Sequence, residues 1–318
     1  MGPTSSTFKF LKEFDLEENS LNGLQIKNVY IPEEIISNIF TYLSPSDILN
    51  CSSVCKRWFN IAKSNALWHT IYNEKEYPKK AKHLPWYVFY LYFATDNFKN
   101  LIENGNGQDG FKNWTIVYNG GDKFRVEKIP VGSDPLPEGI PDFRGKQSCF
   151  ATSFEISSKY QVVDLKEKNL LKYIIRKYKP ALYASEWFAG RFDCGCFYKL
   201  NILCNKNHIQ PSPTMIPDPV RAYILAASIE KPDPASYSLS VEKKIEQWAG
   251  RAWEKVEILS KDYPEDIANI YFCHEGRDTM FWSGHYGSKM AGGVLRFDFD
   301  SILPTDDDVS DNEDDLSN

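Results

Sequence analysis

Residues 31–72 decide the fold of the N-terminal part of the chain, and they read IPEEIISNIFTYLSPSDILNCSSVCKRWFNIAKSNALWHTIY. Apolar residues recur at helical spacing from Ile35 to Leu43, and Pro32 followed by two acidic residues suits the first turn of a helix. Ser44–Asp47 interrupts this helix and offers a cap for a second one, and Leu67–Tyr72 predicts a third. Three short helices bury little surface by themselves, so this module is expected to need a partner.

The remaining composition is that of an ordinary globular protein of about two domains. Among 318 residues, 42% are hydrophobic, 14% aromatic and 25% charged. Residues 306–315 carry seven acids and no base, and without them 37 basic residues face 36 acidic ones. No basic field for nucleic acid is expected, and no run of about 18 apolar residues predicts membrane insertion. Scattered cysteines without a secretory signal indicate a reduced setting, cytosolic or nuclear, and a cytoplasmic location is expected.

Beyond the helical module, the hydrophobic period changes from helical to alternating. Residues 82–103 are aromatic-rich and are predicted to be helical. Trp114–Tyr118 and Phe124–Lys128 alternate on either side of an Asn-Gly-Gly-Asp turn, which predicts a hairpin. Many short strands with Gly, Pro and Asp between them favour an antiparallel β-sandwich. The strand candidates are 150–164, 180–188, 196–204, 253–259, 269–275, 279–283 and 293–300.

Residues 205–250 leave two interpretations open. Val241–Trp248 could form a helix, whereas six prolines between residues 211 and 234 favour a long loop insertion.

Three motifs that could carry chemistry have simpler explanations. Gly105, Gly107 and Gly110 have the spacing of a dinucleotide fingerprint, but no strand precedes them and no helix follows, so they are interpreted as a flexible linker. Cys194 and Cys196 lack further ligands nearby and are interpreted as core residues. The histidines form no triad with a nucleophile, and neither a metal nor a cofactor is expected.

The segment from Ile31 to Trp68 resembles the F-box, above all in Val54-Cys55-Lys56-Arg57-Trp58 followed by Leu67-Trp68. The resemblance implies a face that docks on the Skp-type adaptor and, through it, on the cullin scaffold of a ubiquitin ligase. An apolar face on a module too small to be stable alone agrees with coupled folding and docking. The residues that the resemblance places on this face are Ile31, Pro32, Ile35, Leu43, Val54 and Trp58.

Several segments between about residues 101 and 300 resemble the F-box-associated (FBA) domain. They are Trp114–Asp122, Phe150–Glu155, Gln161–Leu165, Glu186–Cys196 and Asp278–Gly287. In the sugar-recognising branch of that family, this domain is a galactose-binding-like β-sandwich that binds the inner core of high-mannose N-glycans.

The resemblance implies a glycan site in this chain. Aromatic faces suit the apolar faces of N-acetylglucosamine, and a carboxylate suits its hydroxyl and amide groups. The residues that the resemblance implies for the site are Phe154, Asp193, Phe281, Trp282 and Ser283. Where sugar-binding members carry Tyr-Trp-Lys, this chain has Phe281-Trp282-Ser283, and it lacks two hydrogen-bonding groups worth about 0.5–3 kcal/mol each.

The expected organisation is an α+β multidomain chain with an antiparallel β-sandwich. Its expected parts are a flexible lead-in (1–28), the F-box (29–77), linker helices (78–104), the sandwich (105–300, with the insertion near 205–250) and a disordered acidic tail (301–318).

The expected function is that of a non-catalytic substrate-recognition subunit of an SCF-type ubiquitin ligase. It would recruit N-glycosylated misfolded proteins, through their chitobiose core, for ER-associated degradation. A first alternative is a protein degron recognised without sugar. A second is an enzyme tethered by its F-box, which needs a nucleophile–base pair that the sequence does not show.

Overall fold

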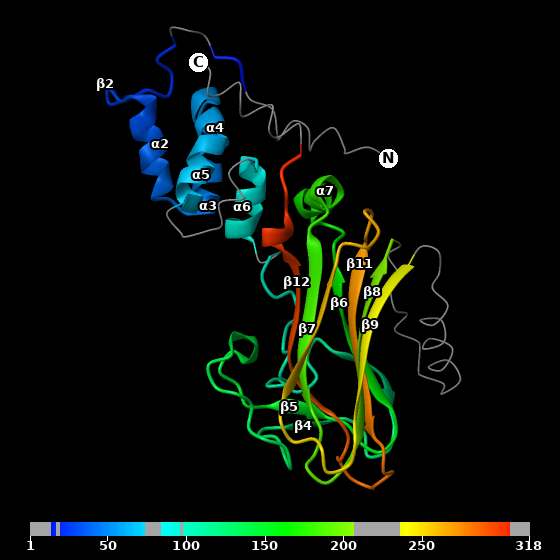
Figure 1. Ribbon diagram of the computed structural model, residues 1–318. Helices are drawn as coiled ribbons and strands as arrows, with labels where there is room; N and C mark the ends of the chain where they lie inside the picture. Colours follow the sequence, from blue (N-terminus) through cyan, green and yellow to red (C-terminus); the bar gives the residue numbers. More distant parts are fainter. Residues whose placement is uncertain (1–13, 17–19, 74–83, 96–97, 207–235, 306–318) are drawn as a thin grey trace. The chain divides into compact units, whose positions relative to one another are not determined.

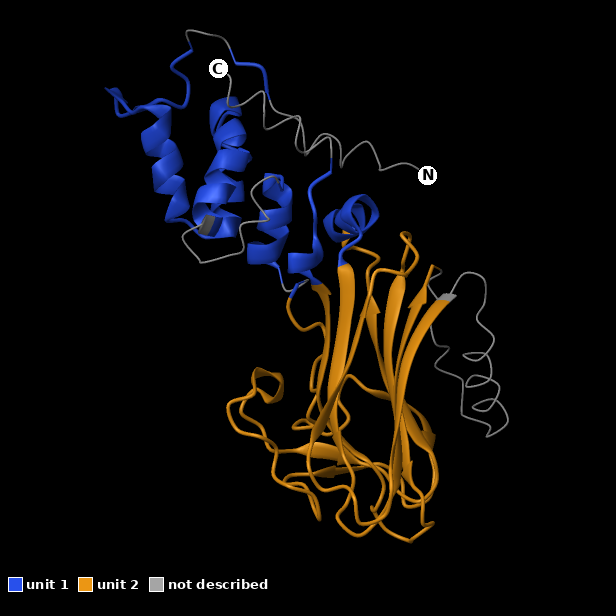
Figure 2. Ribbon diagram, viewed as in Figure 1, with its two compact units in different colours: residues 1–98, 169–180, 298–318 blue, residues 99–168, 181–297 orange. Residues whose placement is uncertain are grey.

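The computed structural model describes residues 14–16, 20–73, 84–95, 98–206 and 236–305. The chain divides into two compact units, coloured separately in Figure 2. Unit 1 comprises residues 1–98, 169–180 and 298–318, and unit 2 comprises residues 99–168 and 181–297. Helices followed by antiparallel sheets confirm the predicted fold class.

Unit 1 contains the predicted helical module, with one difference. Ser44 caps the second helix as expected, since its Oγ accepts a hydrogen bond from the backbone N–H of Asp47. The second helix ends at Cys51, and Cys55 caps a further helix that begins at Lys56. The segment predicted as one helix therefore forms two. The elements are α2 (Glu33–Thr41), α3 (Pro45–Cys51), α4 (Lys56–Ala62) and α5 (Asn65–Asn73).

Part of the predicted flexible lead-in is held against these helices. Residues 20–28 form a turn and the short strand β1 (Gln25–Ile26), which pairs with β2 (Val29–Tyr30). The indole Nε1 of Trp58 donates a 2.7 Å hydrogen bond to the carbonyl oxygen of Gly23. Side chains of the F-box therefore hold residues 20–28 in place. The local sequence of residues 20–28 contains no pattern that predicts these contacts.

Two further helices belong to unit 1. The predicted aromatic helix is shorter than expected and forms α6 (Trp86–Ala94). Helix α7 (Asn169–Tyr178) was not predicted, although Leu171, Ile174, Ile175 and Tyr178 recur at helical spacing on its buried side. The hydroxyl groups of Tyr87 and Tyr178 lie 2.8 Å apart and link the two helices.

Unit 2 is a sandwich of two five-stranded antiparallel sheets (Figure 1). One sheet has the order β10-β7-β12-β5-β4 and the other β3-β6-β11-β8-β9. The strands are β3 (Thr115–Asn119), β4 (Arg125–Glu127), β5 (Cys149–Ala151), β6 (Ser157–Asp164), β7 (Ala181–Ala189), β8 (Cys196–Asn205), β9 (Ser236–Ile245), β10 (Glu254–Ser260), β11 (Asn269–Asp278) and β12 (Lys289–Asp298).

The predicted hairpin around Asn119–Asp122 is wrong. The turn is present, with Lys123 N donating to the carbonyl oxygen of Gly120, but β3 pairs with β6 whereas β4 pairs with β5. The two strands therefore belong to opposite sheets, because each pairs with a strand further along the sequence and not with the other. The connection crosses from one sheet to the other at the end of the sandwich.

The possible helix at Val241–Trp248 is also wrong, since β9 occupies Ser236–Ile245 and pairs with β8 along its whole length. The alternative, a loop insertion over residues 205–250, is wrong for Ser236–Ile245, which belong to this strand, and residues 207–235 of it lie outside the described residues.

The glycines at 105–110 do not form a linker. A Cβ added at Gly105 would lie 3.0 Å from the backbone nitrogen of Gly293 in β12. This segment therefore packs directly on the sandwich, at a distance that is tight for any residue with a Cβ.

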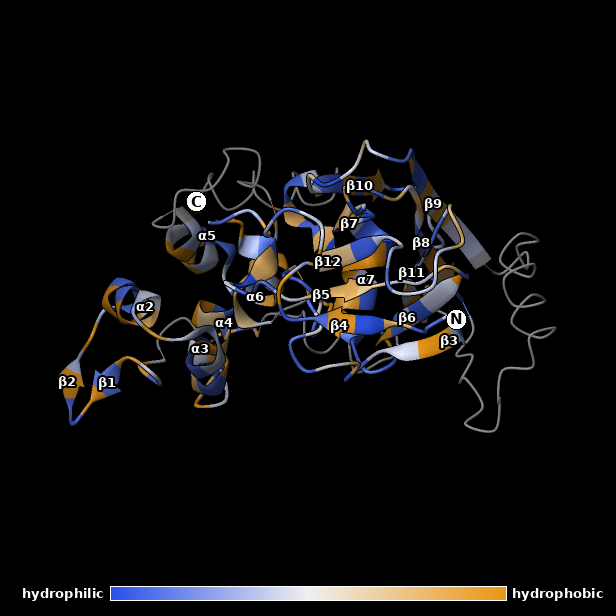
Figure 3. Cartoon of the chain, turned by 90° about the horizontal axis from the view of Figure 1, so that it is seen from below, coloured by the Kyte–Doolittle hydropathy of each residue, from blue (hydrophilic) through white to orange (hydrophobic). Residues whose placement is uncertain are grey.

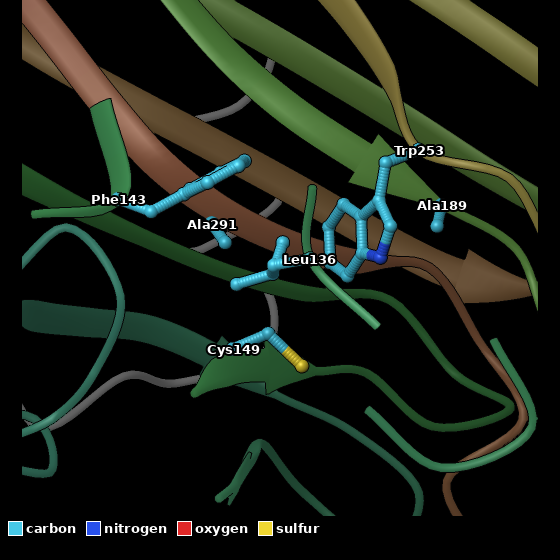
Figure 4. Packing of buried hydrophobic residues seen from close by; sticks show 6 residues of the cluster. All are labelled: Leu136, Phe143, Cys149, Ala189, Trp253 and Ala291. Carbon is cyan, nitrogen blue, oxygen red and sulfur yellow. The ribbon is translucent and has the colours of Figure 1, made fainter. Parts of the chain in front are cut away.

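Hydrophobic and hydrophilic residues alternate along several strands, as Figure 3 shows, and the inward residues form the core. One cluster at the sheet of β4, β5 and β12 is drawn in Figure 4. Its buried residues are Leu136, Phe143, Cys149, Ala189, Trp253 and Ala291.

The core between the sheets also contains a polar group of side chains. The buried carboxylate of Glu186 accepts hydrogen bonds from Tyr198 Oη (2.7 Å) and from His274 Nδ1 (2.7 Å). The His274 ring stacks on Trp114, with ring centroids 4.8 Å apart. Lys159 Nζ lies 3.3 Å from the ring centroid of Trp114, and burial lowers the pKa of Lys159 well below its ordinary value.

Candidate functional site

The predicted glycan-site residues all lie on connections at one end of the sandwich, which Figure 1 shows at the bottom of unit 2. Strands β7, β9 and β11 all end there, and β6, β8, β10 and β12 begin there, because neighbouring strands are antiparallel. The connections that meet at this end are residues 120–124, 152–156, 190–195, 246–253 and 279–288. Residues brought together here are far apart in the sequence.

The carboxylate of Asp278 shapes the loop that carries Phe281, Trp282 and Ser283. Its Oδ1 accepts hydrogen bonds from the backbone N–H groups of Met280 (3.0 Å) and Phe281 (2.6 Å), and its Oδ2 from that of Trp282 (3.2 Å). The side chain is fully buried at the end of β11. Residues 279–283, predicted as a strand, therefore turn away from the sheet.

Phe281 has a left-handed backbone, with a φ of 57°, and 69% of its surface is exposed. A bulky residue rarely adopts this conformation, and an exposed phenyl ring gains little from burial. The half-buried ring of Phe154 meets it edge-on, with centroids 4.9 Å apart. The structure thus brings these two predicted residues together.

Trp282 and Asp193 are connected through two residues that the sequence interpretation did not select. Trp282 contacts Tyr286 edge-on at 5.7 Å, and the Arg191 guanidinium lies 4.4 Å from the Tyr286 ring centroid. Arg191 Nε donates to Asp193 Oδ1 at 2.7 Å. The ion pair with Arg191 therefore fixes the orientation of the Asp193 carboxylate, whose side chain is 18% exposed.

Asp122 anchors the far side of the same loop. Its Oδ2 accepts hydrogen bonds from Ser283 Oγ (3.3 Å) and from the backbone N–H of Gly284 (2.5 Å). Ser153 Oγ donates to the carbonyl oxygen of Gly284 and accepts from the N–H of Asp122. Asp122 and Ser153 were missed as site residues because their partners in the loop, Ser283 and Gly284, lie more than 100 positions away.

The F-box in unit 1 carries the second predicted surface. Ile35 and Val54 are exposed, whereas the other four predicted docking residues, Ile31, Pro32, Leu43 and Trp58, are half-buried. Trp58 meets Phe40 edge-on at 5.4 Å, so it also supports the module from inside. The sequence interpretation missed four exposed apolar residues: Val29, Tyr30, Ile39 and Tyr42.

The remaining motifs have structural roles. Cys194 and Cys196 are fully buried, and burial raises the pKa of Cys196 to about 12, so its thiol stays protonated. Within the described ranges, no group of three or more His, Cys, Asp or Glu residues is arranged to hold a metal ion. In the same ranges, no helix combines the length and the apolar character that crossing a membrane requires.

The chain thus combines a helical module that has an exposed apolar face with a β-sandwich that carries a loop site at one end. This combination defines a class of F-box proteins. The F-box-like family matches residues 29–74, and the F-box associated region matches residues 92–210 and 236–296. The chain belongs to the F-box proteins that carry an F-box associated region. Membership implies the role of a substrate-receptor subunit in an SCF ubiquitin ligase, which docks on a Skp1–cullin core.

Curated relatives match over most of the chain. F-box only protein 6 from Bos taurus is 30% identical over 269 residues, which cover 83% of this chain and 91% of the relative. F-box only protein 44 from Homo sapiens is 28% identical and is covered to 94%. Among solved structures, a carbohydrate-binding module in complex with β-1,4-galactotriose matches 63% of this chain and 99% of its own, at 14% identity and a TM-score of 0.33, too low to support a conclusion.

Proposed function

We propose that this chain recruits N-glycosylated, misfolded proteins to an SCF ubiquitin ligase for ER-associated degradation. The F-box face, with Ile35 and Val54 exposed, would dock on the Skp-type adaptor. The loop site of unit 2, built from Phe154, Asp193, Phe281, Trp282 and Ser283, would bind the chitobiose core of a high-mannose glycan. The chain would act by bringing the client to the ligase and not by catalysis.

One observation carries the glycan proposal: two aromatic rings are presented to solvent on a loop that hydrogen bonds to Asp278 and Asp122 hold in place. Phe281 and Trp282 offer apolar faces for the C–H surface of N-acetylglucosamine. Asp193, already oriented by Arg191, offers an acceptor for hydroxyl or amide groups. Because Asp278 and Asp122 fix the loop before a ligand arrives, little conformational entropy is lost on binding.

The test is binding of chitobiose, and of denatured glycoproteins, to the full chain in complex with its Skp-type adaptor. Trp282→Ala is expected to weaken binding of chitobiose about tenfold, since an aromatic contact worth about 0.5–1.5 kcal/mol is lost together with the area that the ring would bury. Trp282→Phe keeps an aromatic face and is expected to retain part of the affinity. Leu259→Ala changes an exposed residue on β10 and serves as the control.

If Trp282→Ala binds as tightly as the wild type, or if enzymatic removal of the glycans leaves client binding unchanged, the glycan proposal is wrong.

The same geometry favours a second candidate, a protein degron bound without sugar. The Ser283 hydroxyl is already donated to Asp122, and the Asp193 carboxylate already pairs with Arg191. With these polar groups engaged, the exposed rings would suit apolar side chains of an unfolded client. A client that remains bound after deglycosylation, yet is lost with Trp282→Ala, would favour this candidate over the first.

A further inference from the structure

Helix α7 carries a basic surface that the proposed function does not use. The buried side of the helix is largely apolar, whereas residues 169–180 contain four basic residues and no acidic one. Lys172 and Arg176 are four positions apart and therefore lie on one face of the helix, and Lys177 and Lys179 follow at its end. Arg176 is exposed and the three lysines are half-buried. These four residues are called the α7 basic surface below.

The local energetics of the helix explain only part of this surface. Arg176 and Lys177 lie in the last turn, where cations interact favourably with the helix dipole. Lys172 lies near the N-terminus of the helix, where the dipole disfavours a cation, and it faces the like charge of Arg176 at a spacing of four residues. An acidic segment bound along this surface would remove the repulsion between these cations.

The chain itself contains an acidic segment that matches the α7 basic surface in charge. Residues 306–315 carry seven acidic residues and no basic one, whereas the rest of the chain is nearly neutral. They follow directly on Thr305, the last of the described residues, and belong to unit 1, as α7 does. Ten residues span about 35 Å when extended, more than twice the length of about 15 Å expected for α7.

Helix α6 contacts both α7 and the segment that leads to Thr305. Tyr87 of α6 meets Tyr173 of α7, with ring centroids 5.7 Å apart, and Tyr92 of α6 meets Phe299 with centroids 4.4 Å apart. Five residues separate the two α6 tyrosines, about 7.5 Å along the helix. Asp306 follows Phe299 by seven residues, which span up to about 25 Å, so residues 306–315 are long enough to reach α7.

We propose that residues 306–315 bind the α7 basic surface of the same chain. Carboxylates of the segment pair with the cations of the helix, and the segment covers them, so that other anionic molecules are kept from α7. Because salt screens charges at a surface, the contact weakens as the ionic strength rises. The contact involves neither the loop site nor the F-box surface, so it goes beyond the proposed function and does not depend on it.

The first test is carbodiimide crosslinking of the full chain in complex with its Skp-type adaptor, followed by peptide mapping. This reagent joins a carboxylate to a lysine amine without a spacer, so it reports direct contacts. Crosslinks within one chain are expected from residues 306–315 to Lys172, Lys177 or Lys179. Their yield is expected to fall about tenfold in 1 M salt, where charges are screened within about 3 Å.

Charge reversal shows whether the helix is the binding surface. The double variant Lys172→Glu, Arg176→Glu is expected to lower the yield of crosslinks to the two remaining lysines of α7 about tenfold, because attraction becomes repulsion. The double variant Lys128→Glu, Lys243→Glu makes the same change of charge at exposed positions of unit 2 and is the matched control. It is expected to crosslink like the wild type.

A second measurement avoids substitutions in the helix. In a full-length variant, the seven acids of residues 306–315 are replaced by asparagine or glutamine. A synthetic peptide of residues 306–318 is then titrated against this variant and against the wild type. The wild type is expected to bind the peptide about tenfold more weakly, because its own segment competes at a millimolar effective concentration.

Three results would overturn the proposal. One is a set of crosslinks that lead only to lysines outside α7 or to the adaptor, since the segment then binds elsewhere. Another is equal yields for the wild type and the Lys172→Glu, Arg176→Glu variant. The third is a peptide that binds the wild type and the neutralised variant equally, or binds neither. The proposed function stands in each case, because its tests measure binding of glycans and of the adaptor.

Discussion

At the scale of single residues, the candidate site depends on side chains that never reach the ligand surface. Asp278 is fully buried and accepts three backbone hydrogen bonds, and this arrangement holds Phe281 in its left-handed conformation. Hydrogen bonds to a charged group are worth about 1.5–3 kcal/mol each, enough to offset the strain of one bulky residue with positive φ, about 1–3 kcal/mol. The loop is therefore shaped by a fully buried residue.

Asp278→Ala is expected to lower the free energy of unfolding by about 2–4 kcal/mol, because three N–H groups lose their acceptor. Chitobiose binding is expected to fall with it, since Phe281 and Trp282 are no longer held. Denaturant unfolding and a glycan-binding titration measure the two effects. Asp278→Asn keeps one oxygen acceptor and should lie between the wild type and the alanine variant. Equal unfolding midpoints for wild type and Asp278→Ala would contradict this role.

At the scale of strands and sheets, the sandwich is joined by polar contacts as well as by apolar packing. Glu186 on β7 binds Tyr198 on β8 and His274 on β11, so three hydrogen-bonding groups link the two sheets through the core. Among the described residues, neither Lys159 Nζ nor His274 Nε2 has a hydrogen-bond partner. Burial without a full set of partners disfavours the charged forms, so both groups have lowered pKa values.

The stability of the chain is expected to fall between pH 6.5 and pH 4. Burial lowers the pKa of His274 to about 4 from 6.5 in the unfolded chain. Between these values the unfolded state binds the proton and the folded state does not, so acidification favours unfolding, by up to about 3 kcal/mol. Above pH 6.5 neither state is protonated at this group, and its contribution is constant.

The measurement is the free energy of unfolding against pH for the wild type and for His274→Gln, which can still donate to Glu186 but does not titrate. The variant is expected to show a flatter profile between pH 6.5 and pH 4. The comparison with a variant is needed because burial also lowers the pKa of His285. Parallel profiles for wild type and variant would show that His274 does not cause the pH dependence.

At the scale of the whole molecule, the two proposed binding surfaces lie on two separate units. The F-box surface in unit 1 is apolar and exposes Ile35, Ile39, Tyr42 and Val54. The loop site in unit 2 combines exposed rings with charged groups. An apolar face of this kind is typical of a permanent protein partner, whereas the mixed composition is typical of a polar ligand that must be released. A substrate receptor needs both surfaces to act independently.

This independence can be tested with one charge on each unit. Ile35→Asp is expected to weaken adaptor binding by more than about 2 kcal/mol, or about thirtyfold, because a carboxylate would be buried in an apolar interface. Binding of chitobiose should be unchanged. Ile129→Asp places the same charge on an exposed isoleucine of unit 2 and serves as the matched control. Adaptor binding is measured by pull-down, and chitobiose binding by titration. If both variants bind the adaptor equally, Ile35 is not on the docking face.

The sequence by itself determined the helical F-box module, the antiparallel strands behind it and the family, because these depend on local periodicity and on short motifs such as Val54–Trp58. The tertiary structure decided which sheet each strand joins, so that β3 and β4 separate instead of forming a hairpin. It also decided which residues shape the loop site: Asp122 meets Gly284, and Gln247 meets Asp193. These pairs are far apart along the chain, and only the packing of two complete sheets places them within hydrogen-bonding distance.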